Sequence, residues 1–262
     1  MSATPRGHLS FMTMLALVVL LLSGGCAKRV GGPEARTAQP VVTGNIIEHT
    51  VQPGEDLPAI ADDYYGDPGH AADIALLNGL TEGGRLVPGT VLKLRFDSDQ
   101  WGGAQRRAQA LVPYNEGVEM LATERLGEAQ ARFEQALDIA PDLLAARYNL
   151  ALVLLKRGRS DAALEHLDIL VAQRPEAEDF AFARGNALFQ TSNFPLAAAQ
   201  FNALLAMDSG NKRAAFGYAR SLQEAGDRQG AVTAWGNYLK LDSSSGWADA
   251  ARRNLEALQN GD

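Results

Sequence analysis

Residues 144–177 read LAARYNLALVLLKRGRSDAALEHLDILVAQRPEA, and the pattern of this stretch recurs through the second half of the chain. Apolar residues at helical spacing run over Leu144–Arg157 and again over Asp161–Ala172. Gly158 separates the two runs, and glycine is a common helix stop. The stretch therefore predicts two helices joined by a short turn.

The pattern has a period of 34 residues and consists of three tracks in the same phase. An alanine recurs once per period, a small residue stands twelve places before it, and a bulky residue stands four places after it. In chain order the alanines are Ala129, Ala163, Ala197 and Ala231, the small residues Gly117, Ala151, Gly185 and Ala219, and the bulky residues Phe133, Leu167, Phe201 and Trp235. Small residues let two helices approach closely, and the bulky residue fills the groove beside them. Because one helix pair cannot bury its apolar face alone, successive pairs are expected to stack.

This period resembles the tetratricopeptide repeat (TPR), which has small residues at positions 8 and 20, a large one at 24 and often proline at 32. Pro141 and Pro175 occupy the closing position in the first two units, and Ser209 and Ser243 replace it in the last two. The resemblance implies an all-α TPR superhelix over 110–259. Its four helix pairs would span 110–143, 144–177, 178–211 and 212–245, and an amphipathic capping helix would span 246–259.

The first 25 residues predict an export signal. Arg6 supplies a positive charge, and Phe11–Leu22 is an apolar run of 12 residues, shorter than the ~20 that span a bilayer. The run ends in Leu-Ser-Gly-Gly before Cys26, which resembles the bacterial lipoprotein box. The resemblance implies a signal peptide of the lipoprotein type and attachment of acyl chains, palmitate among them, at Cys26. An ordinary secretory signal followed by an incidental cysteine is the open alternative.

Cys26 is the only cysteine, so no disulfide framework competes with lipidation. Several acyl chains would anchor the protein firmly in a membrane. Ala27 follows Cys26, and by resemblance to enterobacterial sorting this favours the periplasmic face of the outer membrane. Residues 26–47 are polar, contain glycine and proline, and lack periodicity, so they predict a flexible tether that reaches about 25 Å.

Residues 48–95 predict a separate small α+β domain. A strand in EHTVQ is stopped by Pro53-Gly54, helices follow over Leu57–Tyr65 and about 70–78, and a strand closes the segment at 90–95. Asp56 is the expected cap of the first helix. This strand–helix–helix–strand (βααβ) unit, with its two Pro-Gly corners, resembles the LysM module. The whole chain is therefore expected to be multidomain, with a linker over 96–109 between the LysM domain and the repeats.

LysM modules bind glycans that contain N-acetylglucosamine, chiefly peptidoglycan in bacteria. The resemblance places the glycan between the loop after the first strand and the loops before the second. The residues carried over are Gly54, Glu55, Asp56 and Leu57 on one side, and Asn78, Gly79, Leu80, Leu86, Val87 and Pro88 on the other. Backbone groups and Asn78 would bond sugar hydroxyl and acetamido groups, and the aliphatic side chains would pack on a sugar face. The alternative for single residues is that glycines only turn the chain and leucines only fill the core.

Composition disfavours catalysis and nucleic-acid binding. Segment 48–95 holds eight carboxylates against three basic side chains, a net charge of −5, and the chain carries −7. Long-range attraction would therefore not assist binding to acidic peptidoglycan or nucleic acid. The four histidines lie in separate segments, so neither a metal site nor a catalytic triad is predicted, and no cofactor is expected. The histidines are His8, His49, His70 and His166.

In the repeats, position 5 of each unit is aromatic: Tyr114, Tyr148, Phe182 and Phe216. By resemblance this position approaches the inner wall of a TPR superhelix, where four rings could grip a peptide. The polar residues expected beside them are Asn115, Asn149, Asn186 and Arg220. The alternative is that the rings replace the bulky residue missing at position 4 and cement adjacent units.

Together these features predict a lipid-anchored cell-envelope protein that binds peptidoglycan and scaffolds an unidentified envelope protein or peptide. An assembly factor for a wall-spanning pilus or secretion complex belongs to the same class. A regulator of peptidoglycan hydrolases or synthases is a second class, and an enzyme in its own right is a third.

Overall fold

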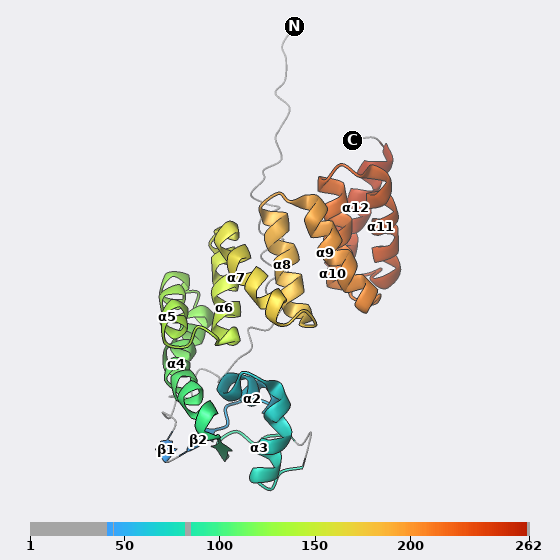
Figure 1. The fold of residues 1–262 in the computed structure, drawn as a ribbon. Helices are drawn as coiled ribbons and strands as arrows, with labels where there is room; N and C mark the ends of the chain where they lie inside the picture. Colours follow the sequence, from blue (N-terminus) through green and yellow to red (C-terminus); the bar gives the residue numbers. More distant parts are fainter. Residues whose placement is uncertain (1–40, 44, 82–84, 261–262) are drawn as a thin grey trace. The chain divides into compact units, whose positions relative to one another are not determined.

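The computed structural model describes residues 41–43, 45–81 and 85–260 (Figure 1). The predicted export signal, Cys26 and most of the predicted tether lie outside the described residues. The described chain divides after Pro175 into two compact units.

The first unit begins with a three-stranded antiparallel sheet in the order β1-β2-β3. Its strands are β1 (Val41–Thr43), β2 (Ile46–Thr50) and β3 (Val91–Arg95). The predicted βααβ order is confirmed, and β1 is an additional strand. The tether prediction is wrong at its end, because Val41–Thr43 pairs with Ile46–Glu48 in a hairpin.

Two helices and a short 3-10 helix connect β2 to β3: α2 (Leu57–Tyr65), η1 (Pro68–His70) and α3 (Ala71–Leu77). Helix α2 starts as predicted, because Asp56 Oδ1 accepts a hydrogen bond of 2.8 Å from the Ala59 backbone N–H. Alternate residues of β2 and β3 face inward, so Ile47, Leu92 and Leu94 are buried together with apolar residues of the helices.

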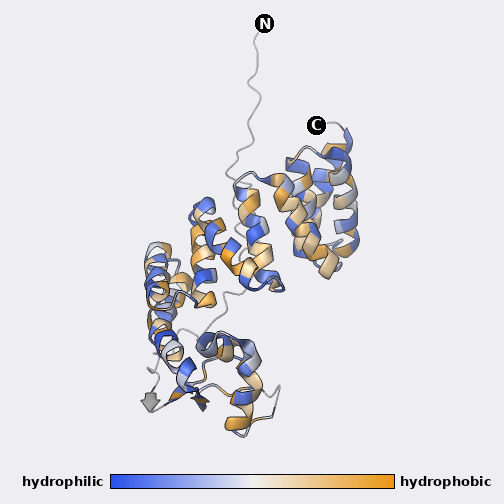
Figure 2. Ribbon diagram, viewed as in Figure 1, coloured by the Kyte–Doolittle hydropathy of each residue, from blue (hydrophilic) through white to orange (hydrophobic). Residues whose placement is uncertain are grey.

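Nine helices follow in the described chain. Those of the first unit are α4 (Ser98–Ala122), α5 (Leu126–Ile139), α6 (Leu144–Lys156) and α7 (Ser160–Gln173). Those of the second unit are α8 (Glu178–Gln190), α9 (Phe194–Met207), α10 (Lys212–Glu224), α11 (Arg228–Leu241) and α12 (Gly246–Asn260). Hydrophobic and hydrophilic residues are interspersed over these helices (Figure 2). The predicted succession of helix pairs with a final helix is confirmed.

Steric contact explains the small and bulky tracks. In the second unit, a Cβ atom added to Gly185 of α8 would lie 2.7 Å from the Phe201 ring of α9. One added to Gly217 of α10 would lie 2.8 Å from the same ring. Carbon atoms pack at about 3.5–4.0 Å, so neither site has room for a methyl group. The Phe201 ring therefore fills the space between α8 and α10.

The linker predicted over 96–109 is wrong, because α4 begins at Ser98, directly after Phe96 and Asp97. The Asp97 backbone N–H donates to Gln100 Oε1 at 3.1 Å, as in a capping box, and this bond stabilises the first turn. The Phe96 ring stacks on Tyr65 of α2 with centroids 4.4 Å apart. The helix therefore extends the first repeat towards the sheet.

Two arginines connect the C-terminal end of α2 to the repeats of the first unit. Arg174, which follows α7, donates to Asp62 Oδ1 at 2.6 Å and to the Gly66 carbonyl at 3.0 Å. Arg107 of α4 lies 3.5 Å from the Tyr64 carbonyl and also forms an ion pair with Asp142. The carbonyls at a helix C-terminus carry partial negative charge, which favours cations there. The small domain is thus docked on α4 and α7.

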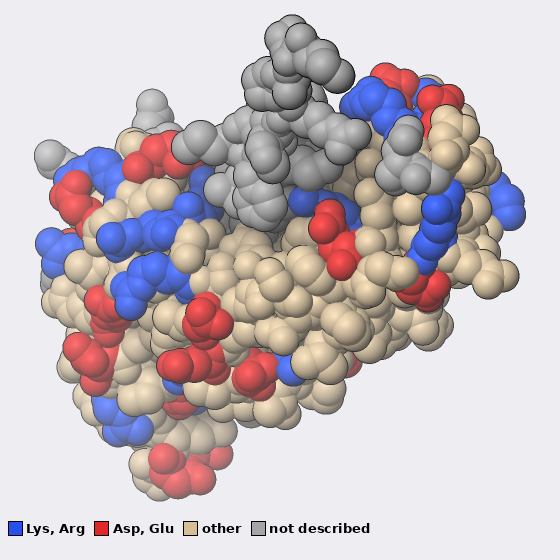
Figure 3. All heavy atoms as spheres, turned by 90° about the horizontal axis from the view of Figure 1, so that it is seen from above, with Lys and Arg blue, Asp and Glu red and all other residues tan. Residues whose placement is uncertain are grey.

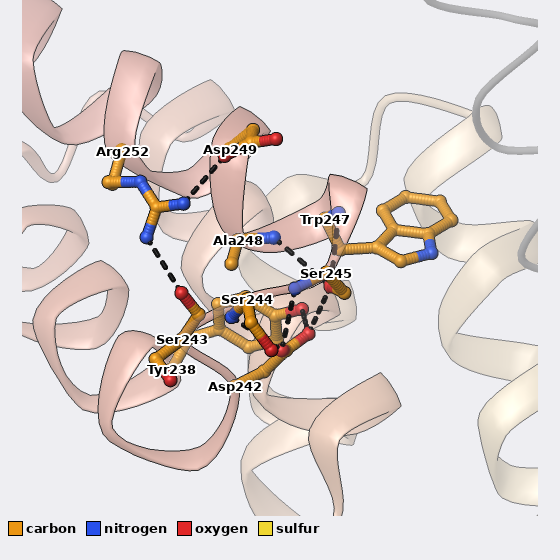
Figure 4. Close-up of polar contacts among 9 residues, drawn as sticks. All are labelled: Tyr238, Asp242, Ser243, Ser244, Ser245, Trp247, Ala248, Asp249 and Arg252. Carbon is orange, nitrogen blue, oxygen red and sulfur yellow. Dashed lines mark hydrogen bonds and ion pairs between the residues drawn. The ribbon is translucent and has the colours of Figure 1, made fainter.

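A carboxylate sets the start of the final helix (Figure 4). Asp242 accepts hydrogen bonds from the hydroxyls of Tyr238, at 2.8 Å, and of Ser245. Ser245 Oγ in turn accepts from the backbone N–H groups of Trp247 and Ala248, at 3.1 and 3.3 Å. These are N–H groups of the first turn of α12, which have no partner within the helix. Asp242 therefore orients the residue that caps α12.

We expect the attachment of α12 to weaken in acid. The hydrogen bonds from Ser245, and next those from Tyr238, lower the pKa of Asp242 to about 2 from its ordinary value of 3.8. A lowered pKa in the folded state gives stability that is present above pH ~4 and is lost as the pH falls towards 2. The protection factors of the Trp247 and Ala248 amides, which correct exchange for its intrinsic pH dependence, should fall over that range. In Asp242→Asn, which does not titrate, exchange should lack this pH-dependent step; an identical step in both proteins would contradict the assignment.

Candidate functional site

Two Pro-Gly turns form the centre of the predicted glycan site. In the turn Gln52–Glu55 the Glu55 N–H bonds the Gln52 carbonyl at 3.2 Å, and Gly54 has φ of 90°. In the turn Val87–Thr90 the Thr90 N–H bonds the Val87 carbonyl at 3.1 Å, and Gly89 has φ of 89°. Proline second and a positive-φ glycine third is the pattern of a type II turn.

The two turns are tied to each other through the backbone. The Gly89 N–H donates to the Val51 carbonyl, and the Val51 N–H donates to the Thr90 carbonyl, each at 2.8 Å. These bonds continue the ladder of β2 and β3 beyond its last pair, Thr50 and Val91. The structure therefore brings together, at one end of the sheet, the two loops that the sequence placed on opposite sides of the site.

The predicted glycan residues differ in exposure. Gly54, Asp56, Gly79, Val87 and Pro88 are exposed, and Leu80 and Leu86 are partly exposed. The prediction for Leu57 is wrong, because this first residue of α2 points into the core and is buried. Asp56 is exposed although one of its oxygens caps α2.

Glu55 is turned inward, so its predicted role as a direct ligand is wrong. Its side chain is only 2% exposed. Oε2 lies 2.7 Å from His49 Nε2 and accepts a 2.7 Å hydrogen bond from the Gln52 backbone N–H. The carboxylate therefore bonds to its own turn and to β2.

Asn78 also bonds within the domain, so its amide N–H groups do not face a sugar as predicted. Its Nδ2 donates to the carbonyls of Ile74 and Lys93 at 2.8 and 2.9 Å, and its Oδ1 accepts from the Lys93 N–H at 2.8 Å. Because β3 lies at the edge of the sheet, the two bonds to Lys93 take the place of a neighbouring strand. Both N–H donors of the Asn78 side chain are thus occupied in joining α3 to β3.

Two exposed aliphatic residues near these loops were missed. Leu76 of α3 is 83% exposed and Val91 of β3 is 53% exposed, and both exceed the usual exposure of such side chains. Ile74 and Ala75 are buried, so the next residue along the helix must face outward at about 100° per residue. The positions of the apolar residues along α3 were the sequence signal that could have placed Leu76 at the surface.

The four position-5 rings of the repeats are buried, so their predicted place on an open groove is wrong. They are Tyr114, Tyr148, Phe182 and Phe216. The Phe182 ring meets the Phe201 ring edge-on at 5.6 Å, and the Phe216 ring meets the Trp235 ring at 4.9 Å. These two contacts each lie within one repeat unit. The alternative role, in which the rings cement adjacent units, agrees with the hydrogen bond between Tyr114 of the first unit and Asn149 of the second. The rings are buried because the repeats lack a bulky residue at position 4, and the rings occupy that space instead.

The polar residues predicted beside the rings are also largely inside. Asn149 is buried and donates to the Tyr114 hydroxyl at 3.0 Å, Asn186 is buried, and Asn115 is partly buried. Arg220 is partly buried with its guanidinium 4.3 Å above the Phe189 ring, and burial lowers its pKa. Of the predicted partner residues, Arg220 and Asn115 are the ones that retain exposed surface.

Charged side chains of both signs are interspersed on the face drawn in Figure 3. Among the described residues, no group of three or more His, Cys, Asp or Glu side chains is placed to hold a metal ion. No helix in the described part of the chain is both long and apolar enough to cross a membrane.

Comparison with protein-family models gives three matches. A LysM domain model matches residues 49–95, and two tetratricopeptide repeat models match residues 120–184 and 182–246. No curated protein matches the chain.

Solved structures similar to this chain are repeat proteins. MamA from AMB-1 is 18% identical with a TM-score of 0.51, over 58% of this chain and 82% of that one. YrrB, described as a TPR protein with an unusual peptide-binding site, is 22% identical with a TM-score of 0.52, over 59% and 77%. A tetratricopeptide repeat protein from Parabacteroides merdae ATCC 43184 is 14% identical with a TM-score of 0.52, over 58% and 60%. At these identities the likeness is one of fold.

Proposed function

We propose that this chain, which contains a LysM domain and tetratricopeptide repeats, is a cell-envelope protein that binds peptidoglycan and holds a protein partner beside it. Both kinds of module bind rather than catalyse. In this proposal Cys26 carries the lipid anchor, and the protein lies at the periplasmic face of the outer membrane. The regulator of wall hydrolases or synthases and the assembly factor differ from it only in the identity of the partner.

The paired Pro-Gly turns are the observation that supports glycan binding most directly. They lie within the segment matched by the LysM model and present exposed backbone at Gly54 beside the exposed side chains of Val87 and Pro88. Aliphatic side chains pack against the C–H face of a sugar, and backbone groups bond its hydroxyl and acetamido groups. Glycan binding would therefore rest on backbone shape and on Val87 rather than on Asn78 or Glu55.

Support for a protein partner is of a more general kind. The repeats share their fold with YrrB, whose description mentions a peptide-binding site. In this chain the four rings are buried, so a partner would contact the exposed parts of the repeats instead. Arg220, held over Phe189, is the contact we propose first, because a guanidinium stacked on a ring keeps its N–H edges available.

Co-sedimentation with purified peptidoglycan sacculi tests the wall-binding role. Full-length protein in mild detergent should pellet with sacculi, and Val87→Glu should weaken binding at least ~10-fold, because a charge replaces an apolar contact with the sugar. Val87 is 67% exposed, so folding should be unaffected. The matched control is Leu196→Glu on α9, where the replaced side chain is 59% exposed.

Each outcome of this experiment has a clear meaning. Binding by the wild type and by Leu196→Glu, with loss in Val87→Glu, supports the proposed site. Equal binding by all three proteins would move the glycan site away from the turn Val87–Thr90. Failure of the wild type to pellet would refute the proposed function.

A further inference from the structure

A chain of three side chains connects the domain core to the first Pro-Gly turn. The Tyr64 hydroxyl of α2 lies 3.1 Å from His49 Nδ1 on β2, and His49 Nε2 lies 2.7 Å from Glu55 Oε2. All three side chains are almost completely buried. Burying polar groups costs free energy of folding unless they form hydrogen bonds, so a buried polar connection of this kind calls for a structural or functional role.

The donors and acceptors of the chain run in one direction. An ionised Glu55 carboxylate can only accept, so His49 Nε2 donates to it. In the neutral ring Nδ1 is then the acceptor, and the Tyr64 hydroxyl donates to it. Burial raises the pKa of Tyr64, so this hydroxyl keeps its proton. The Tyr64 hydroxyl, both ring nitrogens of His49 and Glu55 Oε2 thus each have a partner.

The carboxylate end of the chain closes the turn. Glu55 Oε2 also accepts from the Gln52 backbone N–H, while the Glu55 N–H bonds the Gln52 carbonyl. Gln52 and Glu55, the first and last residues of the turn, are therefore joined twice, once by backbone and once by side chain. Gly54 remains at the surface, with no atom within 4 Å of where a Cβ would be.

We propose that Glu55, oriented by His49 and Tyr64, is a positioning residue that holds the turn Gln52–Glu55 in the shape that receives the glycan. The inference rests on the proposed function and deepens it. A turn fixed before binding loses less conformational freedom when a ligand arrives, so affinity is higher than for a mobile turn. The carboxylate thereby supports binding without touching the sugar, and the backbone at Gly54 makes the contact.

Two substitutions separate positioning from direct contact. Glu55→Ala removes the acceptor for both His49 and the Gln52 N–H, so binding to sacculi should weaken about 10-fold. Glu55→Gln can keep an oxygen at the position of Oε2, where it accepts from both the Gln52 N–H and His49 Nε2. Binding by Glu55→Gln should therefore stay within about threefold of wild type. The control is Asp73→Ala on α3, where the removed carboxylate is 75% exposed and binding should not change.

Full-length protein in detergent is used for sacculus binding, and amide hydrogen exchange is measured on the same samples. In Glu55→Ala, exchange at the amides of residues 52 and 55, which are bonded within the turn, should accelerate at least ~10-fold, while exchange in β2 and α2 stays near wild type. A general loss of stability would instead accelerate exchange throughout the domain. Full recovery of slow exchange in Glu55→Gln is expected.

The outcomes distinguish this inference from the proposed function. If the wild type binds and Glu55→Ala binds equally well, the positioning role is wrong. If Glu55→Gln binds as weakly as Glu55→Ala, the negative charge itself contacts the ligand, and positioning is again wrong. If the wild type does not bind sacculi, the proposed function fails, and the exchange rates alone decide whether Glu55 holds the turn.

Discussion

Replacing Phe201 by alanine is expected to lower the free energy of unfolding of the second unit by about 3–5 kcal/mol. The ring is buried on α9 and lies against Gly185 of α8 and Gly217 of α10. Truncation leaves a cavity that the two glycines cannot fill, because they have no side chains to move into it. The loss of unfolding free energy should therefore lie towards the upper end of this range.

Urea unfolding monitored by circular dichroism measures this effect. The matched control is Leu196→Ala on the same helix, which removes an exposed side chain and should change the free energy by no more than about 0.5 kcal/mol. A loss below about 1 kcal/mol in Phe201→Ala would mean that the ring does not fill the space between α8 and α10.

Replacing both arginines that bond to α2 is expected to have the second-largest effect on stability. We expect Arg107→Ala with Arg174→Ala to destabilise the first unit by about 2–4 kcal/mol, because Asp62 and the carbonyls of Tyr64 and Gly66 lose their charged partners in a partly buried place. Helix α2 should then exchange its amide protons faster than α4 does.

Hydrogen exchange monitored by mass spectrometry, together with urea unfolding, tests this expectation. Arg125→Ala is the control, because its ion pair with Glu128 is exposed on both sides and such pairs contribute little. Unchanged exchange in α2 of the double variant would show that apolar packing alone holds the small domain on α4.

The repeats were predictable because their signal is steric and local. A glycine such as Gly185 and a ring such as Phe201 recur at a fixed spacing, and each makes sense only if the helices touch there. The two Pro-Gly turns were predictable for a similar reason, since few residues other than glycine adopt the positive φ seen at Gly54 and Gly89.

The orientations and hydrogen-bond partners of side chains were harder to predict. Glu55 and Asn78 were given a ligand role by their resemblance to LysM residues, yet both bond inward because a nearby backbone N–H or carbonyl needed a partner. The position-5 rings were assigned to a groove by analogy, although the missing bulk at position 4 already favoured a core role for Tyr148 and Phe182. A linker was predicted over 96–109, whereas the cap formed by Asp97 and Gln100 starts a helix there.

The docking of the small domain on α4 and α7 has a directional consequence. Only Phe96 and Asp97 separate β3 from α4, and Arg174 closes the other side of the junction, so the domain cannot swivel freely about a hinge. If the paired turns bind a glycan strand as proposed, the direction of that strand determines the orientation of helices α4–α7. Copies of the protein bound along one strand would then share one orientation, which the direction of the glycan strands in the wall would set.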